Sequence, residues 1–138
     1  MSVEIFKSGG RLEDVAHYSR AKRVGPFVYI AGTTAIEPSG KLRAPGDAYE
    51  QSRYILERVA QALEAVGAEM RHVVRTRGYL VSLSEHGPGF MKAHGEVFAG
   101  IEPVSCGIEC GLNQPGMVVE IEVDAVVHDA DGKIDWNL

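Results

Sequence analysis

Acidic and basic side chains recur at alternate positions in two segments of the chain, with Glu120, Glu122 and Asp124 in one and Arg75 and Arg77 in the other. Residues at alternate positions of a β-strand share one face of the sheet. A carboxyl group crowded by other carboxylates has a raised pKa and can move protons near neutral pH, while guanidiniums bind anions. The same pattern also fits a solvated face with cross-strand ion pairs, each contributing about 0.2–1 kcal/mol. Spacing alone leaves both interpretations open.

Four further residues could contribute to a ligand site, and each has an ordinary structural alternative. Tyr18 could close a cleft and donate its phenolic hydrogen to a ligand, or it could pack as an interface aromatic. Gly32 and Thr33 end a predicted strand, where a missing side chain exposes backbone donors to a ligand, although a β-bulge gives the same pattern. His94 could carry protons near neutral pH, although a lone helical histidine is more often a surface or interface residue.

The two cysteines and five histidines predict neither a disulfide nor a metal centre. Cys106 and Cys110 are four positions apart in a predicted strand, about 13 Å, which exceeds the span of a disulfide. We expect both cysteines to face the helices as core residues. The histidines form no cluster with cysteine or aspartate at ligand spacing, so we expect no metal.

Apolar periodicity predicts an α+β domain with two helices on one face of a mixed sheet. The strongest helix signal covers residues 47–66, with Asp47 as the N-cap and Gly67 just beyond the end. A weaker helix is predicted at Pro88–Phe98. The predicted strands are Val3–Lys7, Phe27–Thr33, Val73–Leu83, Val104–Cys110 and Val118–His128.

Alternation within these strands predicts which side chains share the charged face. The side expected to meet the helices holds Val74, Thr76, Gly78, Leu80, Val104, Cys106, Ile108, Cys110, Val119, Ile121, Val123, Ala125 and Val127. Ser105 and Glu109 then lie on the opposite face with the carboxylates and guanidiniums, where Arg77 could pair with Glu109 or Glu120. This face is either open to solvent or one wall of a polar cleft between subunits.

Length and composition narrow the class of protein. A chain of 138 residues with a net charge of -5 fits one domain spanning residues 1–138. With 14 basic against 19 acidic residues, a nucleic-acid partner is not expected. No apolar run approaches the roughly 18–20 residues of a membrane span, and the amino terminus lacks a secretory pattern. We therefore expect a cytoplasmic protein in a reducing compartment, with no membrane partner.

Several motifs, in order and at the expected spacing, resemble those of the Rid (YjgF/YER057c/UK114) family. The segments, each with the family pattern that it resembles, are His17–Gly32 ("PYSQA…vG…vfvSG"), Asp47–Gly67 ("D…Q…L…aG"), Val73–Leu83 ("vvkttvyl"), Pro103–Glu109 ("PARS/T-x-VE") and Val119–Glu122 ("vEIEa").

The resemblance implies a chorismate-mutase-like (bacillus type) α+β fold assembled as a homotrimer with clefts between the subunits. It also implies hydrolysis of a small reactive enamine or imine to a carbonyl compound and ammonia, without a metal or organic cofactor. Glu120 matches the family's water-orienting glutamate. The candidate site then has Glu120 and Tyr18 as catalytic residues and, as substrate-binding residues, Ser105, Arg75, Arg77, Gly32, Thr33, His94 and Cys106.

Ser105 departs from the family pattern, because deaminating members carry an arginine there that binds the substrate carboxylate. A hydroxyl cannot replace a bidentate guanidinium, so either Arg75 or Arg77 binds the carboxylate or the ligand lacks one. His94 occupies a position where the family often has asparagine. The sequence leaves two functions open: a Rid-type deaminase with altered specificity, and a non-catalytic trimeric small-molecule-binding or protein-protective module.

Overall fold

Helix α2, Ala48–Ala65, forms where the apolar stripe predicts it. The Asp47 side chain caps its start by accepting a hydrogen bond from the backbone N–H of Glu50 at 3.0 Å. Gly67 follows its end with a φ of 76°, which favours glycine. Neither α2 nor any other helix within residues 2–137 is long and apolar enough to cross a membrane. The stripe is fully buried at Ile55, Val59 and Leu63.

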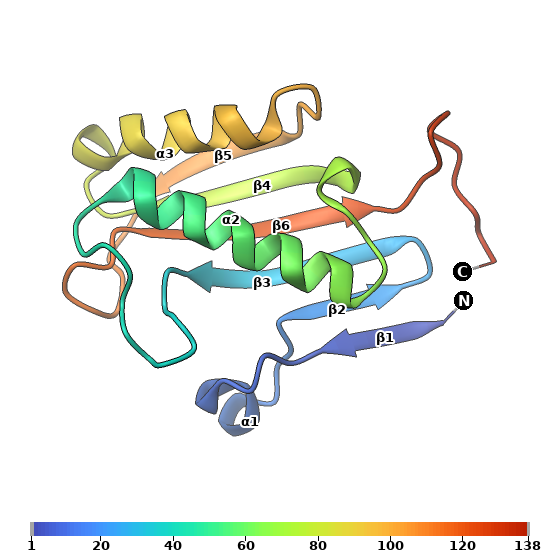
Figure 1. Ribbon diagram of the computed structural model, residues 1–138, viewed down its shortest axis with the longest axis horizontal. Helices are drawn as coiled ribbons and strands as arrows, with labels where there is room; N and C mark the ends of the chain where they lie inside the picture. The colour runs from blue at the N-terminus through green and yellow to red at the C-terminus, as the bar shows by residue number, and fades with distance from the viewer. Residues whose placement is uncertain (1, 138) are drawn as a thin grey trace.

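The computed structural model describes residues 2–137 and contains one six-stranded sheet in the order β1-β2-β3-β6-β4-β5 (Figure 1). Only β4 and β5 pair in parallel. Helices α2 and α3 lie side by side on one face, which confirms the predicted α+β architecture. The remaining bounds are β1 Val3–Phe6, α1 Arg11–Ala16, β2 Ala21–Val24, β3 Phe27–Thr34, a 3₁₀ turn Met70–His72, β4 Val73–Leu80, α3 Leu83–Phe98, β5 Val104–Glu109 and β6 Val119–Val126.

Several boundaries differ from those that the sequence predicts. Helix α3 begins at Leu83 and contains Pro88 in its interior, whereas proline was expected to mark its start. A proline there removes one backbone donor, and the helix tolerates that loss. Strand β4 accordingly ends at Leu80, and Ser82 turns the chain with a φ of 51°. Helix α1 and strand β2 were not predicted. Six residues are less than two helical turns, and in β2 the charged Arg23 occupies a buried position, so the strand shows no apolar alternation.

Strand β6 alternates between the two faces as predicted. Its apolar residues face the helices, and Val119, Ile121 and Val123 are fully buried. Its three carboxylates lie on the opposite face and are half-buried. In β4 the alternation is interrupted after Val73, which is buried, so that Val74 is exposed instead of facing the helices. A β-bulge of this kind redirects one side chain without breaking the strand.

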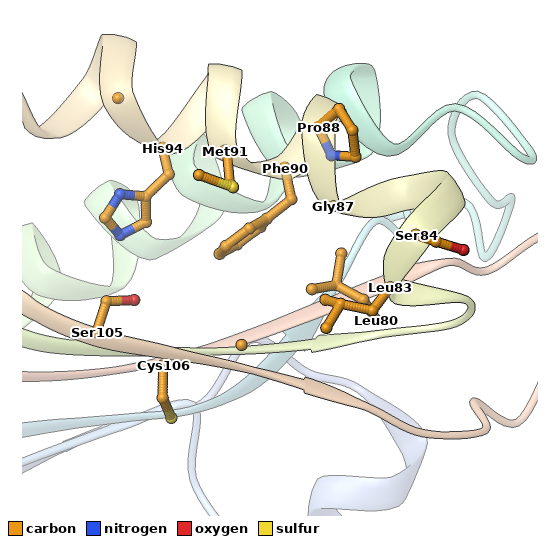
Figure 2. A pocket seen from close by; sticks show the side chains of 12 residues that line it. Leu80, Leu83, Ser84, Gly87, Pro88, Phe90, Met91, His94, Ser105 and Cys106 are labelled. Carbon is orange, nitrogen blue, oxygen red and sulfur yellow. The ribbon is translucent and has the colours of Figure 1, made fainter.

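Strand β5 has the reverse orientation to the predicted one. Ser105 points toward α3, and Cys106 points away from it (Figure 2). The Ser105 hydroxyl accepts a hydrogen bond from Thr76, which is fully buried on the helix side. Cys106 is exposed and Cys110 half-buried, so the prediction that Cys106 is a core residue is wrong. Because β5 is an edge strand, its apolar side chains can occupy the outer face and small residues can lie under α3.

Gln51 of α2 connects the helix to two loops beside the end of β3. Its side chain is fully buried. The amide donates to the carbonyls of Ala44 and Gly116 at 3.0 and 2.8 Å and accepts from the N–H of Val118 at 3.0 Å. All of its polar atoms are therefore satisfied by the backbone.

We expect Gln51→Leu to lower the free energy of unfolding by about 2–4 kcal/mol, because it leaves buried backbone groups without partners. Urea denaturation measures this loss. Gln61→Leu, at an exposed position of the same helix, is the control and should change stability by no more than about 0.5 kcal/mol. Equal stability of the two variants would contradict the assignment.

Candidate functional site

Most of the charged face of the sheet is a structural network. Arg77 lies 3.2 Å from Asp124 and 3.6 Å from Glu122, instead of pairing with Glu109 or Glu120. Tyr79 donates its hydroxyl hydrogen to Glu122 at 2.7 Å, and this bond, together with burial and the charge of Glu122, raises the pKa of Tyr79 to about 12. The cross-strand interpretation is therefore right for this part of the face.

Glu120 stands apart from this network. Among the described residues its carboxyl group has no salt bridge or hydrogen-bond partner. Burial raises the pKa of Glu120, the charge of Arg20 opposes that rise, and the charge of Glu122 adds to it. A carboxyl group with a raised pKa and no fixed partner can accept and return a proton.

Gly32 makes room for the Glu120 carboxyl group. A Cβ at position 32 would lie 2.5 Å from Glu120 Oε2 and 3.1 Å from its carboxyl carbon. The register between β3 and β6 shifts between Ile30 and Thr33, so the β-bulge interpretation of this segment holds. The bulge buries Thr33, whose hydroxyl donates to the carbonyl of Ala31 at 2.8 Å. Thr33 therefore does not line the pocket with Gly32.

The Glu120 side chain lines a pocket of about 360 Å³ beside the end of β3 and the start of β6. We call it the Glu120 pocket. It brings together three of the predicted site residues: Tyr18, Gly32 and Glu120. Its other lining residues are Ser8, Gly10, Arg11, Leu12, Glu13, Arg20, Thr34, Ile36, Gly40, Arg58, Asn113, Gln114 and Met117.

A second hollow, the α3–β5 groove, has a volume of about 790 Å³ and is lined by three more of the predicted residues, His94, Ser105 and Cys106. His94 and Ser105 project into it from opposite walls (Figure 2). Thr76 links them: its hydroxyl donates to Ser105 Oγ at 2.7 Å and lies 2.8 Å from His94 Nε2. Because Thr76 has one proton to donate, it accepts from His94 Nε2–H. Burial lowers the pKa of His94, which favours its neutral form.

The groove holds no charged side chain among its lining residues, which are Leu80, Leu83, Ser84, Gly87, Pro88, Phe90, Met91, His94, Gly95, Ser105, Cys106 and Gly107. Arg77 is engaged on the opposite face of the sheet. Arg75 is exposed and lines neither hollow. Within one chain, neither arginine provides a cation for a ligand at Ser105.

The Glu120 pocket and the α3–β5 groove are separate sites of the isolated chain. Ser105 points to the helix side of the sheet, whereas Glu120 points to the other side. One small ligand cannot touch both side chains of the same copy. Among residues 2–137, no group of three or more histidine, cysteine or acidic residues is placed to hold a metal ion.

The neighbours of Glu120 allow a direct test of the causes of its raised pKa. We expect Arg20→Gln to raise the pKa of Glu120 further, because it removes a positive charge, and Glu122→Gln to lower it, because it removes a negative one. A carbon-13 NMR titration of the Glu120 carboxyl carbon measures both shifts. Shifts of the opposite signs would contradict the electrostatic account.

A family model described as Endoribonuclease L-PSP matches residues 9–127, most of the chain. The chain is a member of this family, also known as the Rid or YjgF family. A RutC family protein of Pyrococcus abyssi is 26% identical over 125 residues, which cover 91% of this chain and 98% of that protein. The resemblance inferred from the motifs is confirmed.

Solved structures of Rid family relatives share the fold. A YjgF/YER057c/UK114 family member from Mycobacterium tuberculosis is 38% identical, with a TM-score of 0.82, and the match covers 91% of this chain and 100% of that one. A protein of Thermotoga maritima described as a putative endoribonuclease is 23% identical with a TM-score of 0.76, covering 94% of this chain and 98% of its own. That likeness supports the fold alone.

Two guanidiniums of the Glu120 pocket, Arg20 and Arg58, were not predicted as site residues. Arg20 had a signal: it stands where the quoted Rid motif "PYSQA" has glutamine, in the segment His17–Ala21. Arg58 had none, because it belongs to the polar side of an amphipathic helix, where a charged residue is ordinary.

Proposed function

We propose that this Rid family protein is a hydrolytic deaminase of a reactive enamine or imine, releasing a carbonyl compound and ammonia. The observation that carries the proposal is Glu120, a half-buried carboxyl group with a raised pKa and no ion-pair partner, which opens into a pocket beside Gly32 and Tyr18. The other carboxylates of the same strand face, Glu122 and Asp124, are bound to Tyr79 or Arg77.

The reaction needs one water molecule, both of whose protons end on the nitrogen. As the water oxygen bonds to the C=N carbon, Glu120 accepts one proton from the water and passes it to the nitrogen, which gives a carbinolamine. Glu120 then accepts the proton of the carbinolamine hydroxyl and gives it to the nitrogen, so that ammonia leaves as the C=O bond forms. An enamine first takes a proton on carbon to become the imine. A pKa raised toward neutrality suits a group that alternates between base and acid.

Tyr18 is the second catalytic candidate of the pocket. It is partly exposed at its rim, and the guanidinium of Arg20 lies 5.4 Å from the centre of its ring. Its phenolic hydroxyl forms no hydrogen bond with the described residues and is free to bind the ligand. A hydroxyl donor beside Glu120 can orient the substrate nitrogen or the attacking water.

The complete site is proposed to form between two copies of the chain in a homotrimer. The Glu120 pocket and the α3–β5 groove each hold some of the predicted residues, and they open on different sides of one sheet. Strand β5 is exposed along its whole length, including the apolar Val104 and Ile108, 57% and 44% exposed. A neighbouring copy that covers this edge would place its Glu120 pocket against the groove, and such an interface protects an edge strand.

The direct experiment is to measure ammonia release from a panel of freshly generated imines and enamines with and without the protein. Imines with and without a carboxylate, and with small and large apolar substituents, belong in the panel. We expect at least one substrate to be hydrolysed faster than in buffer. A panel with no acceleration would exclude the deaminase function.

A non-catalytic small-molecule binder is the second candidate, and the α3–β5 groove favours it. This hollow is the larger of the two, and its lining is predominantly apolar. A pure binder would show ligand-dependent rises in melting temperature without turnover of any panel member. The ribonuclease activity that some relatives' descriptions suggest is disfavoured by the net charge of -5.

A further inference from the structure

Glu13 is a buried carboxylate of the Glu120 pocket that the proposed mechanism does not use. It is 3% exposed and is the one buried residue of α1, whereas Leu12 and Val15 of the same short helix are exposed. Helix α1 projects from the body of the molecule (Figure 1). The helix therefore buries a charged side chain and leaves its apolar ones in solvent. Because burying a charge is costly unless it has partners, the partners of Glu13 matter.

Ser8 and Arg20 are these partners. The two carboxylate oxygens of Glu13 accept hydrogen bonds from the N–H and the hydroxyl of Ser8 at 3.0 and 2.5 Å. Arg20 Nε, which is buried and makes no hydrogen bond, lies 3.6 Å from Glu13 Oε2. Both oxygens of Glu13 act as acceptors, as expected of an ionised carboxylate. Glu13 is therefore the counter-ion of Arg20.

Arg20 also lies beside Glu120. Its Nη1 donates to the carbonyl of Gly32 at 2.9 Å, and Gly32 is the residue whose missing Cβ makes room for the Glu120 carboxyl group. The charge of Arg20 opposes the rise in the pKa of Glu120. Within residues 2–137, however, the only carboxylate within 4.0 Å of the Arg20 guanidinium is that of Glu13. One guanidinium thus borders two carboxyl groups and pairs with one of them.

We propose that Glu13 is a positioning residue that binds Arg20 and thereby keeps this guanidinium from pairing with Glu120. The inference rests on the proposed deaminase function, in which the Glu120 carboxyl group must be free to bind water. Removing one member of a buried ion pair leaves the other charge uncompensated, which is strongly unfavourable. Glu120 is the neighbouring carboxyl group without a partner, so it would become the new counter-ion of Arg20. A carboxylate paired with a guanidinium is a weaker base.

The other charged groups around Glu120 do not supply this counter-ion. Besides Glu120, Glu13 is the only acidic residue among the described residues that line the pocket. Arg58 is a second cation and donates to the carbonyl of Thr34 at 2.6 Å. The remaining titratable groups that line the pocket or flank Glu120 on the sheet are Arg11, Tyr18, Tyr79 and Glu122. Of these only Glu122 is acidic, and it is bound to Tyr79 and lies near Arg77.

The test is a carbon-13 NMR titration of the Glu120 carboxyl carbon in Glu13→Gln. Glutamine keeps the shape and one acceptor oxygen for Ser8 but removes the charge that binds Arg20. We expect the pKa of Glu120 to fall by about one pH unit, because a guanidinium within about 4–6 Å favours the ionised carboxylate. The rate depends on ionised Glu120, so the acid limb of the pH–rate profile should move down by the same amount. A weaker base should also lower kcat by about threefold or more, with little change in KM.

Asp14→Asn is the matched control, because it removes the same charge from the next, exposed position of α1. It should leave the pKa of Glu120 and the rate at their wild-type values. Adding Arg20→Gln to Glu13→Gln should return the pKa of Glu120 to at least its wild-type value and raise kcat above that of Glu13→Gln, because the competing cation is gone. A merely structural role of Glu13 predicts no such rescue.

An unchanged or raised pKa of Glu120 in folded Glu13→Gln would overturn the inference, and so would an equal fall in Asp14→Asn or a failed rescue. If Glu13→Gln alone does not fold, the double variant decides, because it removes both members of the buried pair. A pKa of Glu120 below the wild-type value in that variant would overturn the inference. The titration needs no substrate, so the expected shift in a protein that hydrolyses no imine would refute the deaminase function and keep Glu13 as the counter-ion.

Discussion

Glu120→Gln is expected to abolish imine hydrolysis while leaving the fold in place. Glutamine has nearly the same shape, and the Glu120 carboxyl group makes no ion pair or hydrogen bond with the described residues that the change would break. It removes the carboxyl group of the Glu120 pocket whose raised pKa suits proton transfer to and from water. We expect the rate of ammonia release to fall by about 10²- to 10⁴-fold, the usual contribution of general acid–base catalysis.

The matched control is Glu122→Gln, two positions along the same strand and on the same face. Glu122 accepts from Tyr79 and lies near Arg77, so its loss should reduce stability more than the rate. Equal rates for wild type and Glu120→Gln would remove Glu120 from the mechanism. A rate lost in both variants would show that the whole charged face matters instead of one carboxyl group.

Gly32→Ala is expected to lower kcat by about 10- to 100-fold through displacement of the Glu120 side chain. The new Cβ would lie 2.5 Å from Glu120 Oε2, closer than two such atoms can approach. The φ of Gly32 is outside the left-handed region, so alanine fits the backbone and the strain falls on the carboxyl group. Misplacing a catalytic group by about 1 Å can reduce the rate by about a hundredfold.

Gly111→Ala is the control for Gly32→Ala, since nothing lies within 4 Å of its added Cβ. We expect wild-type kcat for this variant. In Gly32→Ala, circular dichroism and the melting temperature check that the fold persists. If kcat is unchanged and the fold persists, the position of Glu120 in this structure is not the one from which it catalyses the reaction.

The faces of β6 could be predicted because both of them are constrained. Val119, Ile121 and Val123 must fill the core under the helices, so Glu120 and Glu122 must lie on the other side. Strand β5 lies at the sheet edge, so its apolar residues are not required to face the helices. Its alternation correctly separates apolar from small polar residues, but a sequence does not say which set faces the helices.

The site could be predicted only in part. Alternation placed Glu120, Glu122 and Asp124 together but could not show that Tyr79 and Arg77 bind two of them and leave Glu120 free. The register sets Tyr79 opposite Glu120 and Arg77 opposite Glu122, yet the two side chains reach diagonally, Tyr79 to Glu122 and Arg77 to Asp124. Arg58 reaches the pocket from α2 at the end of β3, where it donates to the carbonyl of Thr34, and this proximity arises only on folding.

We propose that one active site combines the Glu120 pocket of one subunit with the α3–β5 groove of another. Its most direct test mixes two inactive variants, Glu120→Gln and Ser105→Trp, the second filling the groove, and reassembles them at equal amounts. Random assembly places an intact pocket against an intact groove in about a quarter of the interfaces. We therefore predict recovery of about a quarter of the wild-type rate of ammonia release. A mixture as inactive as its components would contradict a shared site.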